Sequence, residues 1–70
     1  MSGLLDELYP AAQHIVRASG NASVSFLQRH LIIGYNRAAT LMEALESQGI
    51  VSAFVPGAGR TLLNPQKNPS

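Results

Sequence analysis

Apolar side chains recur at helical spacing in three segments of the chain, which predicts three helices. The first segment covers residues 4–18, and its apolar positions are Leu4, Leu5, Leu8, Ala11, Ala12, Ile15 and Val16. Pro10 interrupts this segment, because an interior proline removes a backbone hydrogen bond and clashes with the preceding turn. The first helix is therefore expected either to begin close to Pro10 or to be kinked there.

The second helix is short and follows a loop at residues 19–23, "SGNAS". Ser25 is followed three residues later by Gln28, which is the spacing of a capping box. The sequence therefore predicts a helix from about residue 26 to residue 31.

The third helix is expected over residues 35–48. Gly34 breaks the chain before it, and Gly49 follows it in the position that favours a left-handed C-terminal cap. Only a tight turn separates this helix from the second one, which is typical of helix-turn-helix units.

The pattern changes from helical to extended after the third helix. Residues 50–55, "IVSAFV", are rich in β-branched and aromatic side chains, and residues 56–59, "PGAG", are typical of a turn. Residues 60–63 can return as a second strand, which predicts a hairpin. Val24 is a candidate for a third short strand beside it.

Three helices and a C-terminal hairpin wing predict the α+β class and a winged helix-turn-helix. We assign residues 1–64 to this domain and residues 65–70, which are polar and broken by proline, to a disordered tail. The alternative is an all-helical bundle with a loose C-terminal segment. It would leave residues 50–55 as an exposed hydrophobic stretch, which is unfavourable.

Composition narrows the class of function. Seventy residues support only one core. With 46% hydrophobic and 13% charged residues, the chain is too apolar to be disordered. The chain has no cysteine, which excludes disulfides and thiolate metal sites and suits the cytoplasm. Its apolar runs are too short to span a membrane.

His14 and His30 have no acidic neighbours in sequence, so we expect no metal, cofactor, small-molecule substrate or enzymatic activity.

The charges are segregated along the chain, although the formal net charge is only +1. Residues 8–42 contain three arginines and no acidic residue, and Arg60 and Lys67 are also unopposed. This layout is either a modest basic face that meets phosphate or an ordinary solvated surface.

The third helix has two different faces. Its core-facing positions are Ala38, Leu41, Met42 and Leu45. The opposite face carries Asn36, Thr40, Glu43 and Ser47, flanked by Arg37 and Ala44. The start of that face suits entry into a DNA major groove, where arginine reads guanine and asparagine reads adenine. A plain solvated face fits the same residues.

The segment "ASVSFLQRHLIIGYNRAATLMEALESQGIV", residues 22–51, resembles the gamma domain at the C-terminus of the DNA translocase FtsK. The shared features are a serine-capped short helix, a "QR" pair, "IGYNRAA" and an "E-x-x-G-I/V-V" ending. The resemblance extends over about residues 6–64, and "IGYNRAA" is its most specific part. It implies a winged-helix domain that reads short, G-rich, oriented sites in double-stranded DNA. It also implies as partners further copies of itself and a tyrosine recombinase.

The resemblance also implies roles for single residues. Asn36 and Arg37 occupy the family's base-reading positions, with Thr40 on the same face. Gln28 and Arg29 match its "QR" pair, which reaches the DNA backbone or a groove edge.

Two further positions have alternatives. Tyr35 fits either a phosphate contact or a ring that packs the turn. Arg60 stands where the wing reaches the flanking backbone or minor groove, or is a surface arginine that contacts nothing.

The chain also departs from the family pattern. Residues 30–32 are His, Leu and Ile where the family is commonly basic, and the wing is unusually apolar. No GxxxxGK[ST] phosphate-binding loop is present, so this chain cannot translocate DNA by itself. It is either a domain of a larger protein or a stand-alone relative from a phage or other mobile element.

Two functions are therefore weighed. The first is a sequence-specific DNA-binding module, acting as an address reader for a motor or as a small transcriptional regulator. The second is a protein-interaction module that binds a recombinase or another copy of itself through the apolar wing and the first helix, with Phe54, Val55 and Leu62 as the contact residues. Simple packing of the wing on the first helix is the alternative role of these three residues.

Overall fold

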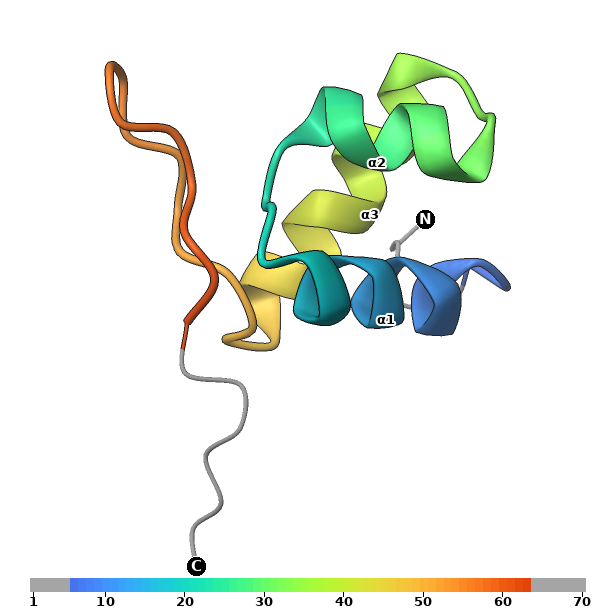
Figure 1. The fold of residues 1–70 in the computed structure, drawn as a ribbon, viewed down its shortest axis with the longest axis horizontal. Helices are drawn as coiled ribbons and strands as arrows, with labels where there is room; N and C mark the ends of the chain where they lie inside the picture. Colours follow the sequence, from blue (N-terminus) through green and yellow to red (C-terminus); the bar gives the residue numbers. More distant parts are fainter. Residues whose placement is uncertain (1–5, 64–70) are drawn as a thin grey trace, which may run out of the picture.

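The computed structural model describes residues 6–63, which form three helices followed by a C-terminal segment that turns back on itself (Figure 1). Helix α1 spans Tyr9–Ser19, α2 spans Val24–Leu31 and α3 spans Tyr35–Ser47. Helix α3 packs against both other helices, and its contact with α2 is the most extensive. The prediction of three helices in this order is confirmed, and the predicted tail at residues 65–70 lies outside the described residues.

Helix α1 begins at Tyr9, so Pro10 is its second residue. The first N–H groups of a helix have no partner within the helix, so a proline there loses no hydrogen bond. Asp6 shapes the turn before the helix, because its Oδ1 accepts from the Leu8 N–H at 2.9 Å and its backbone oxygen accepts from the Tyr9 N–H at 2.9 Å. Of the two alternatives for Pro10, a start close to the proline is confirmed.

Helix α2 begins earlier than predicted, and the prediction of Ser25 as its capping residue was wrong. Ser23 has an extended backbone, and its hydroxyl accepts a hydrogen bond from the Phe26 N–H at 3.3 Å. Ser25 lies inside the helix, where its hydroxyl hydrogen-bonds that of Ser23. Val24 is the first helical residue and not a strand residue, because the serine that caps the helix precedes it.

Helix α3 ends at Ser47, one residue before the predicted end, and Gly49 follows with a φ of 76°. The Gly49 N–H donates to the Glu46 carbonyl and the Ile50 N–H donates to the Leu45 carbonyl, both at 2.9 Å. These two bonds form a Schellman motif, which satisfies carbonyls that the helix end leaves open. The predicted role of Gly49 is confirmed.

The core is centred on α3. Its predicted core positions Ala38, Leu41, Met42 and Leu45 are all fully buried. The other buried side chains are Ala12, Val16, Ala22, Leu27, Ala44, Ile50 and Val51. Ala44 was expected on the flank of the exposed face. Its single methyl group does not reach past longer neighbouring side chains, so the exposed face of α3 is narrower than its periodicity indicates.

The C-terminal ribbon, residues 50–63, is antiparallel but irregular. Val51 bridges Leu62 and Val55 bridges Gly59. Three residues lie between the bridged positions on the outgoing segment, 52–54, and only two on the return, 60 and 61. An extra residue on one side disrupts the ladder of hydrogen bonds between two strands. The two predicted strands are therefore replaced by two isolated bridges within the described residues.

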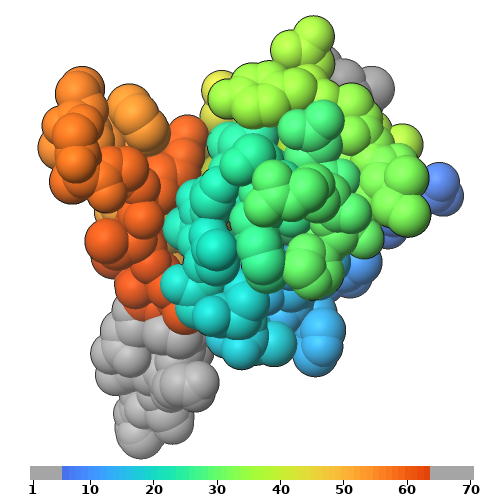
Figure 2. Space-filling view, turned by 45° about the horizontal axis from the view of Figure 1, so that its top comes forward, coloured from blue at the N-terminus to red at the C-terminus, as the bar shows by residue number. Residues whose placement is uncertain are grey.

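The tip of the ribbon is a tight turn at Pro56 and Gly57. The Ala58 N–H donates to the Val55 carbonyl at 2.9 Å, and Gly57 has a φ of 89°. Proline followed by a glycine with positive φ is the signature of a type II turn. The ribbon stands as an arm beside the helices (Figures 1 and 2).

The turn between α2 and α3 contains a strained residue, Ile32. Its φ is 54° and 88% of the residue is exposed. A positive φ is unfavourable for a β-branched side chain.

We expect Ile32→Gly to raise the free energy of unfolding by about 1 kcal/mol, because glycine tolerates positive φ and little packing is lost. Urea denaturation followed by circular dichroism measures this change. Ile32→Ala is the control, since it removes most of the side chain but keeps the Cβ atom, which is unfavourable at positive φ in every L-residue. An equal gain from alanine would contradict the explanation.

Candidate nucleic-acid interface

The exposed face of α3 presents Asn36 and Thr40 to solvent near the start of the helix. The Asn36 side chain is exposed and makes no hydrogen bond within residues 6–63. The Thr40 hydroxyl donates to the Asn36 backbone oxygen at 3.0 Å, so its single donor is already used. The free amide of Asn36 is therefore the main hydrogen-bonding group here, and Thr40 contributes a methyl group and acceptor lone pairs.

Arg37 flanks this face and forms an ion pair with Asp6, which precedes α1. Its Nε donates to Asp6 Oδ2 at 2.8 Å and its Nη2 donates to Oδ1 at 2.7 Å. The Arg37 side chain is 45% exposed, whereas that of Asp6 is 15% exposed. Arg37 thus lies at the surface, where its remaining N–H groups can contact a ligand. The two hydrogen bonds to Asp6 restrict the motion of its guanidinium.

The pair shifts the pKa of both groups in favour of their charged forms. Hydrogen bonds from Arg37 and then from the Leu8 N–H lower the pKa of Asp6 to about 2, against a smaller opposing effect of burial. The hydrogen bond to Asp6 raises the pKa of Arg37 above its usual value. Both residues therefore stay ionised at neutral pH.

The lowered pKa of Asp6 predicts a loss of stability in acid. The folded-state pKa is about 2 and the ordinary value is 3.8. The stabilisation is therefore complete above the ordinary pKa and disappears as the pH falls through the folded-state pKa. We expect the free energy of unfolding to fall over this range more steeply for the unmodified chain than for Asp6→Asn. Urea midpoints at pH 5, 3 and 2 test this. Glu7→Gln removes the adjacent exposed carboxyl group as a control, and an unchanged pH slope in Asp6→Asn would refute the assignment.

The "QR" pair lies in α2. Gln28 is half-buried and Arg29 is exposed in the last turn of the helix. Neither side chain makes a hydrogen bond or ion pair within the described range 6–63. The Arg29 guanidinium is thus exposed, with none of its N–H groups engaged in this range.

Arg60 connects the ribbon to α3. Its Nη1 donates to Glu46 Oε1 at 2.7 Å and to the Ser52 carbonyl at 3.2 Å, and its side chain is only 12% exposed. The alternative in which Arg60 contacts nothing is wrong. An Arg60 contact to DNA would require the guanidinium to give up Glu46 or to use its remaining N–H groups.

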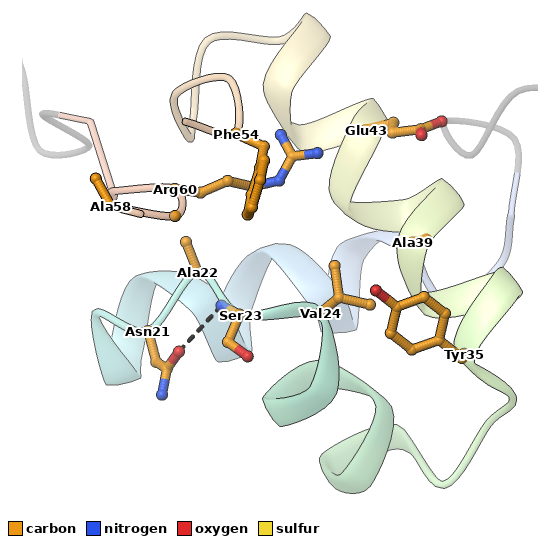
Figure 3. A pocket seen from close by; sticks show the side chains of 11 residues that line it. Asn21, Ala22, Ser23, Val24, Tyr35, Ala39, Glu43, Phe54, Ala58 and Arg60 are labelled. Atoms are coloured by element: carbon orange, nitrogen blue, oxygen red, sulfur yellow. Dashed lines mark hydrogen bonds between the residues drawn. The ribbon is translucent and has the colours of Figure 1, made fainter. Parts of the chain in front are cut away.

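A groove of about 590 Å³ lies between α3, the segment before α2 and the ribbon (Figure 3). Its wall on α3 is Tyr35, Ala39 and Glu43, and the ribbon contributes Phe54 and Arg60 among others. The space-filling view shows the tip of the ribbon standing away from the helices while its base abuts them (Figure 2). Tyr35 is exposed and lines the groove, with its ring near Val24 (Figure 3), so it does not pack into the core.

Sequence reasoning missed the acidic partners of both arginines. Asp6 and Arg37 are 31 residues apart, and Glu46 and Arg60 are 14 apart. No local spacing rule connects positions at such distances. The one feature of the sequence that pointed to such pairs is its composition, because it has four acidic residues and four arginines, which can pair with one another.

Comparison with known families matches residues 4–64 to the FtsK gamma domain. The chain belongs to the FtsK gamma domain family. Known FtsK sequences agree with this. The chain is 46% identical over 67 residues to DNA translocase FtsK 2 of Ralstonia nicotianae, an alignment that covers 96% of this chain and 9% of that protein. It is 52% identical over 58 residues to DNA translocase FtsK 1 of Neisseria meningitidis serogroup B, covering 83% of this chain and 7% of that protein.

The family assignment confirms the resemblance seen in the sequence. The chain spans less than a tenth of the length of these FtsK relatives, so it corresponds to one small part of a translocase. In residues 6–63 of this FtsK gamma domain, no helix has both the length and the apolar character needed to cross a bilayer. The same residues contain no cluster of three or more histidine, cysteine or acidic side chains that could hold a metal ion.

Proposed function

We propose that this FtsK gamma domain is a winged-helix module that binds double-stranded DNA and reads a short, oriented, G-rich site. The observation that carries the proposal is the first turn of α3. There an unbonded amide on Asn36 and a surface guanidinium on Arg37 lie side by side in sequence, and no acidic residue of α3 comes before Glu43. Family membership supports the same function.

Each group at the interface has a matching chemical partner on DNA. The Asn36 amide can donate to N7 and accept from N6 of adenine, and Arg37 can donate to O6 and N7 of guanine. The Thr40 methyl group can contact a thymine methyl. Gln28, Arg29 and Tyr35 lie on α2 and at the start of α3, where they can hold phosphates and set the register. Arg60 would reach the flanking backbone from the ribbon.

Binding by one copy should be weak. About three phosphate contacts predict a slope of about −2.7 for log affinity against log salt, which is roughly a 40-fold loss between about 50 and 200 mM salt. Neighbouring copies on one site, or attachment to a larger protein, would supply the missing affinity through effective concentration.

The proposed role is to recognise oriented DNA sites for a DNA motor. The relatives quoted above are DNA translocases, which favours this role over that of a transcriptional regulator. A binding module of this kind carries out no catalysis of its own. Its place of action would be the cytoplasm, where the chromosome lies.

Selection of bound duplexes from a random pool tests the proposal. The full chain should enrich a guanine-containing motif, and Asn36→Ala should lose that enrichment while still folding. A gel-shift titration on the selected duplex at low and moderate salt then measures the slope. If no duplex is retained in dilute buffer, the proposed function is wrong.

A second candidate function rests on the ribbon. Phe54 is 61% exposed and Val55 is 51% exposed. The ribbon therefore offers apolar surface to a recombinase or to another copy of the domain. Leu62 does not belong to this surface, because it packs against the core. A pure interaction module would give no shift on random duplex DNA at low salt, whereas sedimentation velocity would show self-association that Phe54→Ser abolishes.

A further inference from the structure

The ion pair between Asp6 and Arg37 leaves one particular edge of the guanidinium open. Arginine carries five N–H groups in a rigid plane. Asp6 takes one from Nε and one from Nη2. Three remain, two on Nη1 and one on Nη2. One N–H of Nη1 and the remaining N–H of Nη2 point off the end of the guanidinium in parallel, which is the geometry that a bidentate contact to guanine O6 and N7 requires.

Asp6 can hold the guanidinium because Asp6 is itself held. Its Oδ1 accepts from the Leu8 N–H and its backbone oxygen accepts from the Tyr9 N–H, so it belongs to the turn that starts α1. Only 15% of its side chain is exposed, which leaves little freedom to move away. Fixing an arginine side chain costs conformational entropy, and here folding fixes it before any ligand arrives.

We propose that Asp6 is a positioning residue of the DNA interface, which occupies the side edge of the Arg37 guanidinium and aims its free end at a guanine. This inference rests on the proposed function. A carboxylate at this place repels phosphates, so it lowers affinity for every sequence while it sharpens the choice between sequences. Asp6 therefore lowers the affinity of the domain for DNA and increases its discrimination between sequences.

The test compares two duplexes, the one selected by the unmodified chain and a scrambled duplex of the same composition. Asp6→Asn keeps the size of the side chain but removes its charge. We expect it to bind the scrambled duplex at least as tightly as the unmodified chain does and to lower the ratio of the two affinities about tenfold, within the range of one bidentate base contact. The matched control is Glu7→Gln, which removes the neighbouring negative charge and should leave the ratio unchanged.

A double variant separates positioning from other roles. In the Arg37→Ala background, Asp6→Asn should cause no further loss of discrimination, because the group that Asp6 positions is gone. Equal ratios for Asp6→Asn and Glu7→Gln would overturn the proposal. So would an equal gain on both duplexes, which would make Asp6 a simple repulsive charge, or an equal loss on both with a changed circular dichroism spectrum, which would make its role structural.

Nuclear magnetic resonance of the unmodified chain gives a test that needs no variant. The Arg37 Nε–H should give a resolved, slowly exchanging signal in the free protein, and this signal should persist in the complex with the selected duplex. Its loss on binding would mean that Arg37 leaves Asp6 to reach DNA, and the proposal would be wrong. If the unmodified chain prefers no duplex over another, the failure lies instead with the proposed function.

Discussion

Leu41→Ala should lower the free energy of unfolding by about 3 kcal/mol. Leu41 lies in α3 and is fully buried in the core that the three helices share. Truncating a buried leucine removes its transfer free energy and leaves a cavity, which together cost about 2–5 kcal/mol. Because a domain of this size is stable by only about 4–10 kcal/mol, the variant should retain about 1–7 kcal/mol of stability.

Urea denaturation followed by circular dichroism measures this loss. Ile32→Ala is the matched surface control, since it truncates a similar side chain that is 88% exposed and should cost nothing. A loss below about 1 kcal/mol for Leu41→Ala would mean that the helices are not packed around this side chain. The melting temperature of the variant should fall by more than about 10 °C, given the small entropy of unfolding of so short a chain.

Positions such as Leu41 could be predicted from the sequence because helical periodicity is a local property. The apolar stripe of α3 repeats at the spacing that a helix imposes, and all four of its predicted core positions are buried. Gly49 could be predicted for a similar reason, because a left-handed residue after a helix strongly favours glycine. Such features depend on neighbours within one or two turns of the chain.

The start of α2 could not be predicted from spacing alone. Ser23 and Ser25 both precede apolar residues, and either can accept a hydrogen bond from an N–H group three residues later. The choice falls on Ser23, whose extended backbone allows its hydroxyl to reach the Phe26 N–H. Backbone conformation at a single residue, which no composition rule fixes, therefore also decides that Val24 is helical.

The arginine partners and the ribbon depend on contacts that are distant in the chain. The register of the ribbon is interrupted because its two bridges enclose unequal numbers of residues. Asp6 and Arg37 are 31 residues apart and meet across the fold, in which α1 packs against α3. The sequence thus indicated which residues could face DNA, but the structure was needed to see that one of them has a fixed orientation.

The second large effect concerns Arg37 and Arg29, whose removal should affect DNA binding in different ways. Arg37→Ala should lower the ratio of affinities between sites about tenfold to 100-fold, because it removes a bidentate contact to one base. Arg29→Ala should weaken binding to all sequences alike and should make the salt slope shallower by about 1, because it removes a phosphate contact. Fluorescence anisotropy titrations on the selected and scrambled duplexes at several salt concentrations measure both quantities.

Arg17→Ala is the control for this pair, because it removes the same charge from an exposed position in the last turn of α1, an element to which no DNA contact is assigned. It should change neither discrimination nor the salt slope by more than long-range charge accounts for. We expect Arg37 and Arg29 to behave differently because their surroundings differ. A carboxylate offsets the charge of Arg37 and fixes its plane, which suits recognition of a base edge, whereas Arg29 has no charged partner within residues 6–63 and suits a phosphate. Equal losses for both variants on every duplex would show that the two arginines act only as charges, and the assignment of base reading to Arg37 would then be wrong.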